Sequence, residues 1–295
     1  MVTVSATALV VAGGQLLVGQ DPTWRPLVGP QAQAFLRTAL GGATFPWSLL
    51  AAATRWRMAR GLLRGLERIF LPGLFAHQAL RKQLLREWAR QSISEGVEQV
   101  VVLGSGLDTL ALELSGVFPG TRFIEFDRAP SLNLKRSAYE RYGGLKNNHA
   151  LVEGDLARGG VEDQLARSPL YFRQARTLFV VEGVLMYLEA EEVTVLLGEL
   201  GARPAGTTWC AFSFMGLDVS GRPSFVDERS PVQGWLRRRD EVFRWGSTHE
   251  HLADMLTTAG FTVRAMTERD TLAGRAPGKN AKVARGEYLC LSRNS

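Results

Sequence analysis

Residues 100–109 read Val-Val-Val-Leu-Gly-Ser-Gly-Leu-Asp-Thr, a short apolar run that leads directly into a glycine turn. The run at 100–103 is continuous and rich in valine, which is typical of a parallel strand buried on both faces. A helix is expected to follow at about 110–115. A strand, a glycine turn and a helix in this order open a parallel α/β fold, in which ligands bind beyond the carboxyl ends of the strands.

Three further apolar runs are predicted to form parallel strands, and an acidic residue follows each of them. The runs and their acids are 122–126 with Asp127, 149–153 with Asp155, and 177–181 with Glu182. Because the carboxyl ends of parallel strands share one edge of the sheet, these acids should converge with Gly104 and Gly106 on one ligand. A carboxylate at the end of the second strand suits a ribose, since it can accept both hydroxyl hydrogens. The sequence therefore predicts a cofactor that contains a nucleoside.

The later part of the chain continues to alternate between strands and helices. A fifth strand is expected at 208–214, and residues 262–266 and 288–292 are expected to close the sheet as an antiparallel pair. Ser247-Thr-His-Glu250 resembles a capping box, so a helix should begin there and end before Gly260.

The glycine turn differs from the fingerprint of dinucleotide-binding proteins. Thr109 stands where the third glycine is required, and the carboxylate of Asp108 would repel a pyrophosphate. A phosphate-binding loop with Gly-Lys-Ser/Thr is also absent from the sequence. A cofactor without phosphates, S-adenosylmethionine, fits the turn better. A nicotinamide-dependent oxidoreductase is the alternative enzyme, and Thr109 disfavours it.

The positive charge of the chain is concentrated in one segment. The whole chain has a formal net charge of +6, while residues 55–90 hold nine basic and two acidic residues. Within that segment, residues 55–70 alternate arginines and apolar residues at helical spacing. We expect a solvated helix that caps the core of the protein, and binding to nucleic acid or to an anionic membrane surface is the alternative. Nucleic acid is the less favoured partner, because no recognised nucleic-acid motif accompanies the segment.

Several segments together resemble the leucine carboxyl methyltransferase family, which includes polyketide O-methyltransferases of the tetracenomycin type. The segments are 100–109, Phe123-Ile-Glu-Phe-Asp127, Leu178-Phe-Val-Val-Glu-Gly-Val-Leu-Met-Tyr-Leu188 and Phe243-Arg-Trp-Gly246. The resemblance implies the Rossmann-like fold of class I methyltransferases, an α/β fold with a helical N-terminal lid. Its mostly parallel sheet has seven strands in the order 3-2-1-4-5-7-6, with the last strand antiparallel.

The resemblance also assigns roles to individual residues. Arg81 would pair with the methionine carboxylate of S-adenosylmethionine, and Glu182 would lie near its amine. Gly104 and Gly106 would form the cofactor turn and Asp127 would hold the ribose, while Asp155 and Leu156 would flank the adenine. Gln15 departs from the family, because many relatives carry a basic residue there that contributes to binding the cofactor carboxylate.

The sequence pattern divides the chain into two parts, because a helical stretch gives way at Gly96 to alternating strands and helices. Residues 1–95 are predicted to form a helical N-terminal cap or lid, and residues 96–295 a catalytic core with a lid insertion at about 216–246.

Two cysteines, Cys210 and Cys290, cannot form a disulfide framework, which fits a reducing cytoplasm. The apolar runs are too short for a membrane span. His249 and His251 are two residues apart on a predicted helix and do not face each other, so no metal site is expected.

The predicted activity is S-adenosylmethionine-dependent O-methyl transfer to a small molecule. A carboxylate acceptor is already ionised at neutral pH, whereas a phenol would need a general base. The sequence contains no clear Ser-His-Asp or paired-carboxylate arrangement, which favours the carboxylate. Tyr187 and Arg244 are candidates for contact with the reacting groups. A binding or scaffold protein that keeps the fold without turnover is the alternative from another class.

The lid insertion carries arginines and aromatic residues that suit an acidic, partly apolar acceptor such as a polyketide. They are Arg222, Phe225, Trp235, Arg237, Arg238, Arg239 and Arg244. We expect at least one of these arginines to contact the acceptor.

Overall fold

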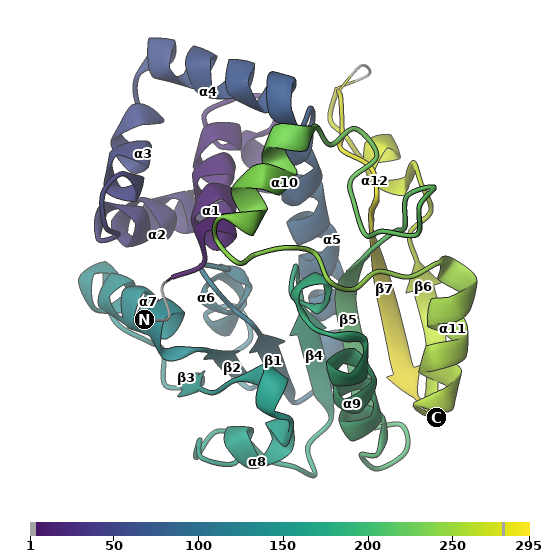
Figure 1. Ribbon diagram of the computed structural model, residues 1–295. Coiled ribbons are helices and arrows are strands. Elements are labelled where there is room, and N and C mark those ends of the chain that lie inside the picture. The colour runs from purple at the N-terminus through teal and green to yellow at the C-terminus, as the bar shows by residue number, and fades with distance from the viewer. Residues whose placement is uncertain (1–3, 279–280) are drawn as a thin grey trace.

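The computed structural model describes residues 4–278 and 281–295, so the first three residues of the predicted cap lie outside the described part. Its seven strands form one sheet in the order β3-β2-β1-β4-β5-β7-β6 (Figure 1). The strands are β1 (Gln99–Leu103), β2 (Arg122–Asp127), β3 (His149–Glu153), β4 (Thr177–Val181), β5 (Thr208–Met215), β6 (Phe261–Met266) and β7 (Glu287–Asn294). The predicted strand order of a class I methyltransferase is confirmed.

Strand direction also follows the prediction. β1 pairs in parallel with β2 and with β4, while β7 runs antiparallel to both β5 and β6. All residues of β1, β4 and β5 are buried, which agrees with their unbroken apolar sequence. The sheet is therefore covered on both faces.

Helices cover the sheet and its upper edge. They are α1 (Ala6–Val18), α2 (Pro30–Gly41), α3 (Trp47–Ala53), α4 (Arg57–Phe70), α5 (Leu74–Ser94), α6 (Leu110–Ser115), α7 (Ala129–Tyr142), α8 (Val161–Leu165), α9 (Ala190–Gly201), α10 (Ser230–Arg237), α11 (His249–Thr258) and α12 (Thr271–Gly274). Short 3₁₀ turns are η1 (Arg25–Leu27), η2 (Leu156–Arg158) and η3 (Leu185–Tyr187). Among the described residues, no helix combines the length and the apolar content needed to cross a bilayer.

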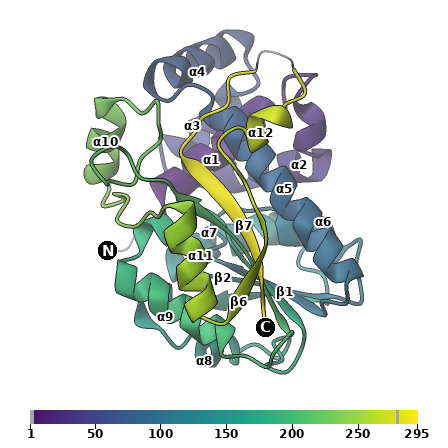
Figure 2. The ribbon, with the colours of Figure 1, turned by 90° about the vertical axis from the view of Figure 1, so that its right-hand side faces the viewer.

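The strand pleat divides the interior into two main cores (Figure 2). Val101 and Phe179 point to the core formed with α8, α9 and α11. Their neighbours Val100 and Leu178 point to the opposite core, formed with α5, α6 and α12. Alternate side chains of a strand face opposite sides, so one apolar run supplies both cores.

The N-terminal helices form a third cluster above the carboxyl ends of the parallel strands. Leu9 and Leu16 of α1 pack with Phe35 of α2, and this group rests on Ala138 and Tyr139 of α7. Helices α1 to α4 therefore stand over the strand ends, and Figure 1 shows α10 from the later insertion on the same side of the sheet.

The predicted capping box at 247–250 is wrong by one residue. Thr248, not Ser247, is the N-cap of α11, and its side chain accepts a hydrogen bond from the backbone N–H of His251. Ser247 is buried, and its N–H donates to the carbonyl of Met215 at the end of β5. Tertiary packing therefore holds Ser247 in the preceding segment, and the helix begins after it. The predicted end of the helix is confirmed, since Gly260 has a φ of 83° just beyond it.

Candidate active site

A cavity of about 930 Å³ lies between the carboxyl ends of the parallel strands and the helices that stand over them. Its walls bring together every residue that the sequence singled out for the cofactor or the chemistry. These residues are Gln15, Arg81, Gly104, Gly106, Asp127, Asp155, Leu156, Glu182, Tyr187 and Arg244. They come from positions up to 229 residues apart, so the fold creates the site.

The backbone of the turn after β1 requires glycine, and both of its glycines line the cavity. Gly104 has a φ of 65°, and a Cβ at this position would lie 2.4 Å from a methyl carbon of Val184. Gly106 has a φ of 43°, and its N–H donates to Asp127 Oδ2 over 2.6 Å. The other oxygen, Oδ1, accepts from the N–H of Arg128 at 2.7 Å. Asp127 thereby ties the turn after β1 to the end of β2.

Burial raises the pKa of Asp127, although its two backbone hydrogen bonds and nearby Lys135 oppose the shift. The carboxylate lies at the cavity wall, where a ligand hydroxyl would compensate its lost hydration. The position thus fits the ribose of a nucleoside.

Five charged side chains form a buried network beside the turn. Arg81 donates to Glu182 at 2.8 Å and to Glu287 at 2.6 Å. Lys82 pairs with Asp108 and with Glu182, the latter at 3.1 Å. All five side chains are at most 11% exposed, so solvent screens these contacts weakly. Counted over these five side chains alone, three carboxylates and two cations sum to one negative charge, and His77 contacts Glu287 at 2.9 Å.

The network keeps its groups ionised. Burial acts against ionisation of Glu287, but Arg81 and His77 lower the pKa of Glu287 to about 2. Burial likewise opposes ionisation of Asp108, and Lys82 holds the pKa of that carboxyl well below its usual range. An excess of negative charge suits a ligand end that carries both an ammonium and a sulfonium, as S-adenosylmethionine does.

The network also alters the role expected for Arg81. Its guanidinium is held by two glutamates, and Glu287 was not among the predicted site residues. The signal for Glu287 was an acid at the start of an apolar strand, but its partner is 206 residues away. Asp108 also organises the loop, since its Oδ1 accepts from the N–H of Leu110 at 2.7 Å.

The turn after β3 lines the opposite end of the cofactor side. Asp155 caps the turn η2 by accepting from the N–H of Ala157 at 3.2 Å. Leu156 packs against the core below it. A Cβ on Gly154 would lie 2.2 Å from the ring of Phe126, so only glycine fits there.

The other half of the cavity is mainly apolar and is built by helices. The apolar residues on this side are Val10, Val11, Leu63, Leu66, Phe70, Leu71, Leu74, Phe75, Met186, Phe225, Val232, Trp235, Leu236 and Phe243. They come from α1, α4, α5, α10 and the loops beside them. This half can surround a ligand of substantial apolar surface.

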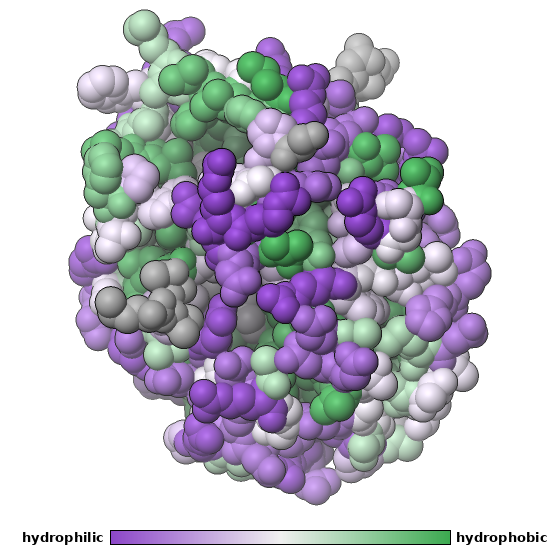
Figure 3. Space-filling model, in the orientation of Figure 1, coloured by the Kyte–Doolittle hydropathy of each residue, from purple (hydrophilic) through white to green (hydrophobic). Residues whose placement is uncertain are grey.

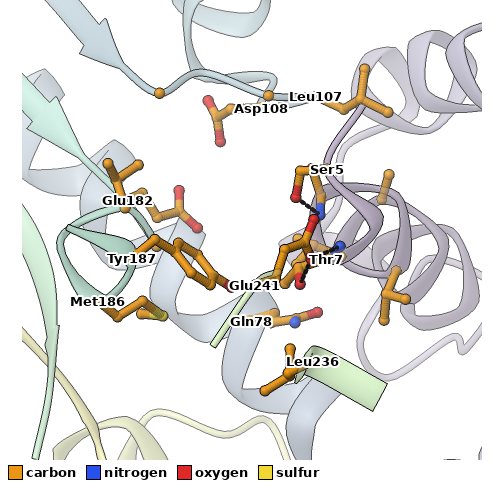
Figure 4. A pocket seen from close by; sticks show the side chains of 18 of the residues that line it. Ser5, Thr7, Gln78, Leu107, Asp108, Glu182, Met186, Tyr187, Leu236 and Glu241 are labelled. Carbon is orange, nitrogen blue, oxygen red and sulfur yellow. Dashed lines mark hydrogen bonds between the residues drawn. The ribbon is translucent and has the colours of Figure 1, made fainter. Parts of the chain in front are cut away.

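A few polar groups interrupt the apolar half. Figure 4 shows Tyr187 pointing toward Glu241 and Thr7 across the cavity. The Glu241 carboxylate accepts from the N–H groups of Ala6 at 2.7 Å and Thr7 at 2.9 Å, the first residues of α1. Burial raises the pKa of Tyr187 above its ordinary value, so its phenol stays protonated at neutral pH. Sequence reasoning missed Glu241, because its partners lie 235 residues away.

Two buried amides in the wall have an atom without a partner. Gln15 is 2% exposed and Gln78 is 4% exposed. Neither Gln15 Nε2 nor Gln78 Oε1 has a hydrogen-bond partner within the part of the chain that the structure describes. A buried polar atom left unpaired costs about 1–3 kcal/mol, so both atoms are suited to a bound ligand.

The arginines of the insertion separate into groups. Arg222 and Arg237 line a different cavity of about 160 Å³. Arg239 stacks over Trp235 at 4.7 Å and over Trp47 at 5.7 Å. Arg244 lines the main cavity but pairs with Glu189 at 2.5 Å and with Asp240 at 3.4 Å.

Arg238 also lines the main cavity, and within residues 4–278 and 281–295 it forms no ion pair. Of the insertion arginines, Arg238 is therefore the best placed to contact an acidic ligand.

The sheet has the strand order of a class I methyltransferase, and the cavity lies at the carboxyl ends of its parallel strands. A family model described as "Leucine carboxyl methyltransferase" matches residues 4–201, and the chain belongs to this family. A Frankia alni protein, provisionally named an S-adenosyl-L-methionine-dependent methyltransferase, is 32% identical over 254 residues, which cover 84% of this chain and 79% of that protein. A Mycobacteroides abscessus protein with the same provisional name is 28% identical and covers 88% and 89% of the two chains.

Two solved structures share the fold. A protein of Thermobifida fusca, provisionally described as a methyltransferase, has a TM-score of 0.58 and 16% identity, covering 90% of this chain and 94% of its own. A DUF574 family protein of Streptomyces avermitilis has a TM-score of 0.57 and 16% identity, covering 90% and 97%. The protein is thus an S-adenosylmethionine-dependent methyltransferase, as the sequence predicted.

Proposed function

We propose that this methyltransferase acts on a carboxylate oxygen of a small, largely apolar molecule. The observation that carries the proposal is that Glu241 and Glu189, two carboxylates on the acceptor side, are already engaged by partners within the protein. Glu241 accepts from the N-terminus of α1. Burial raises the pKa of Glu67, and the backbone N–H groups of Gly73, Leu74 and Phe75 at the start of α5 act against this shift. Glu189 pairs with Arg244. The described lining contains no histidine or cysteine.

Such a site lacks an obvious group to remove a proton, and a carboxylate acceptor needs none. A phenolic hydroxyl is the second candidate acceptor. It loses its proton only near pH 10, so it would need a base that these residues do not supply.

For the cofactor side we propose the roles that the family resemblance implies, and their support is that all these residues line the cavity. Gly104 and Gly106 form the turn, Asp127 holds the ribose, and Asp155 with Leu156 flanks the adenine. When bound, S-adenosylmethionine supplies a methyl group on a positively charged sulfur, which is already an electrophile. The protein therefore has to position the acceptor oxygen in line with that methyl group and to exclude water.

At the methionine end, Glu182 is proposed to receive the ammonium group, with Arg81 and Lys82 fixing its carboxylate. The unpaired Nε2 of Gln15 is proposed to donate to the cofactor carboxylate, in the place of the basic residue of many relatives. Arg81 is also proposed to contact the cofactor carboxylate, although Glu182 and Glu287 already neutralise the charge of Arg81.

The helical cap at 1–95 and the insertion at 216–246 are proposed to cover the acceptor. Support comes from the cavity wall, to which α1, α4 and α10 contribute apolar side chains. Arg238 at the rim of this cover is proposed to attract the acidic group of the acceptor. Tyr187 and Arg244, the two candidates for chemistry, are then positioning residues rather than proton acceptors.

A panel of matched acceptors tests the proposal. The enzyme is incubated with methyl-labelled S-adenosylmethionine and with pairs such as naphthoic acid and naphthol, which differ in the acceptor group alone. Methyl esters release labelled methanol in alkali, whereas aryl methyl ethers do not. We expect alkali-labile product from acids, at a rate that is flat above neutral pH.

Arg238→Gln should raise the KM for an acid about tenfold, in the range of one charge-assisted hydrogen bond, while the matched Arg222→Gln should not. Product that is stable in alkali, formed only from phenols and faster at higher pH, would contradict the proposal.

A further inference from the structure

Helix α4 is amphipathic, yet none of its fourteen residues is buried. Met58, Leu62 and Ile69 are 90%, 66% and 52% exposed. Their spacing places them on one face of the helix, which we call the outer strip. Leu66 and Phe70 lie on the adjoining face and line the main cavity. The outer strip thus faces solvent while its neighbours face the acceptor side.

Further apolar side chains continue the outer strip onto the preceding segment. Phe45, Leu49 and Trp56 are 78%, 57% and 74% exposed. Figure 3 shows the corresponding hydrophobic area over α3 and α4. Contiguous exposed apolar surface of this kind marks an interaction site in a soluble domain.

The polar face of α4 is strongly basic. It carries Arg57, Arg60, Arg64 and Arg68, and Glu67 is the one acid of the helix. Arg64 pairs with Asp21 at 3.1 Å. Arg57 and Arg68 form no ion pair with any residue that the structure describes. A basic face beside an exposed apolar strip is the pattern of helices that lie in the surface of an anionic membrane.

We propose that α4 docks the protein on an anionic lipid surface. The outer strip would enter the region between headgroups and acyl chains, and the arginines would contact lipid phosphates. A second copy of the chain fits less well, because a symmetric contact would bring two arginine faces together. Nucleic acid would use the arginines but leave the outer strip exposed to water. Charge and apolar surface together therefore favour lipid.

Docking through α4 would bring the cavity close to the membrane surface, because α4 also lines the cavity. Leu63, Leu66 and Phe70 lead from the outer strip into the cavity wall. A lipophilic acceptor dissolved in the membrane could then reach the cavity without crossing water. This last step rests on the proposed apolar acceptor, whereas the docking does not.

Flotation of the full chain with vesicles tests the docking. The vesicles contain phosphatidylcholine alone or phosphatidylcholine with about a third phosphatidylglycerol. We expect the protein to float with the anionic vesicles, less so at high salt, and not with the neutral ones.

Two sets of variants separate the contributions of apolar and basic residues. Met58→Gln/Leu62→Gln/Ile69→Gln should lower the partition coefficient between vesicles and water at least about tenfold, since each substitution removes an apolar side chain that would be buried in the membrane. Its matched control is Val117→Gln/Val195→Gln/Val219→Gln, at three other exposed positions. Arg57→Gln/Arg68→Gln should lower partitioning about fivefold per arginine, and Arg136→Gln/Arg167→Gln is the control with equal charge loss.

Binding of S-adenosylhomocysteine shows that each variant is folded, because none of the changed side chains lines the cavity. Equal flotation of the outer-strip variant and its control would overturn the proposal. So would absence of flotation at low salt combined with tight binding to duplex DNA. A dimer that dissociates in the outer-strip variant, without any vesicle binding, would identify a second copy as the occupant instead.

Discussion

The two halves of the cavity are built in different ways. The cofactor half consists of strand ends, a glycine turn and an ion-pair network whose side chains are at most 11% exposed. The acceptor half consists of helices α1, α4 and α10, and α4 buries none of its residues. The comparison teaches that the cofactor half is fixed by the core of the sheet, while the acceptor half depends on helices, one of which, α4, takes no part in a core. Substitutions should therefore have large effects in the first and small effects in the second.

The largest effect is expected at the glycine turn. Gly104→Ala would place a methyl group 2.4 Å from Val184 at a φ of 65°. Strain and crowding should lower the free energy of unfolding by about 2–4 kcal/mol and weaken S-adenosylhomocysteine binding about 100-fold or more. Chemical denaturation and calorimetry measure the two quantities.

The control for this variant is Gly116→Ala, where a Cβ meets nothing within 4 Å and φ is negative. Near-native affinity of Gly104→Ala for S-adenosylhomocysteine would show that the turn is not rigid. It would contradict the claim that the core fixes the cofactor half.

A second effect concerns the ion-pair network and pH. The pKa of Glu287 is about 2 in the folded protein, against an ordinary value of 4.5. Because the pKa of Glu287 is lower in the folded than in the unfolded protein, its ionised carboxylate stabilises the fold at pH values above the unfolded pKa of about 4.5. This stabilisation is lost as the pH falls from about 4.5 toward 2. The expected loss is roughly 3 kcal/mol in the free energy of unfolding. Denaturant titrations at neutral and acidic pH measure it.

Glu287→Gln should be less stable at neutral pH and should depend less on pH in the acidic range. An unchanged acid dependence in this variant would mean that other groups cause the acid sensitivity.

A smaller effect is expected at Glu241, which holds the start of α1 in the acceptor half. Glu241→Ala removes the carboxylate that caps α1 through Ala6 and Thr7. Loss of a helix cap typically costs about 1 kcal/mol, so the amides of these two residues should exchange hydrogen about five times faster. S-adenosylhomocysteine affinity should stay within about twofold.

Glu140→Ala on the exposed end of α7 is the matched control. Strongly weakened cofactor binding in Glu241→Ala would show that the two halves are coupled, contrary to the comparison.

The smallest effect is expected at Tyr187. Its burial keeps the phenol protonated, and its ring packs on Phe243 with centroids 5.8 Å apart. Tyr187→Phe keeps this packing, so kcat with an acid from the acceptor panel should change by less than about threefold. A loss of 100-fold with a changed pH profile would instead make Tyr187 a proton-transfer group.

The same comparison explains what the sequence could predict. The order of the strands and the acids at their ends follow from local patterns, so the sequence could place Gly104, Gly106, Asp127 and Glu182 at one edge of the sheet, where they line the cavity. Each lies in or next to a strand whose apolar run is visible in the sequence. The cofactor half can therefore be predicted from the sequence, because each of its segments is a short, continuous stretch of the chain.

The acceptor half and the ion-pair network are not continuous. Glu241 meets α1 across 235 residues, and Glu287 meets Arg81 across 206. No local period encodes such pairs, because they depend on how whole elements pack. The shifted cap at Thr248 has the same origin, since β5 holds Ser247 through Met215.

Calorimetric titration with S-adenosylhomocysteine tests the central claim most directly, with wild type, Asp127→Ala and the control Asp254→Ala on the exposed side of α11. Asp127 is central because it joins the turn after β1 to the end of β2 and is proposed to hold the ribose. We predict micromolar binding by wild type and by Asp254→Ala, and loss of measurable binding in Asp127→Ala. Equal binding by all three proteins would contradict the placement of the cofactor at these strand ends.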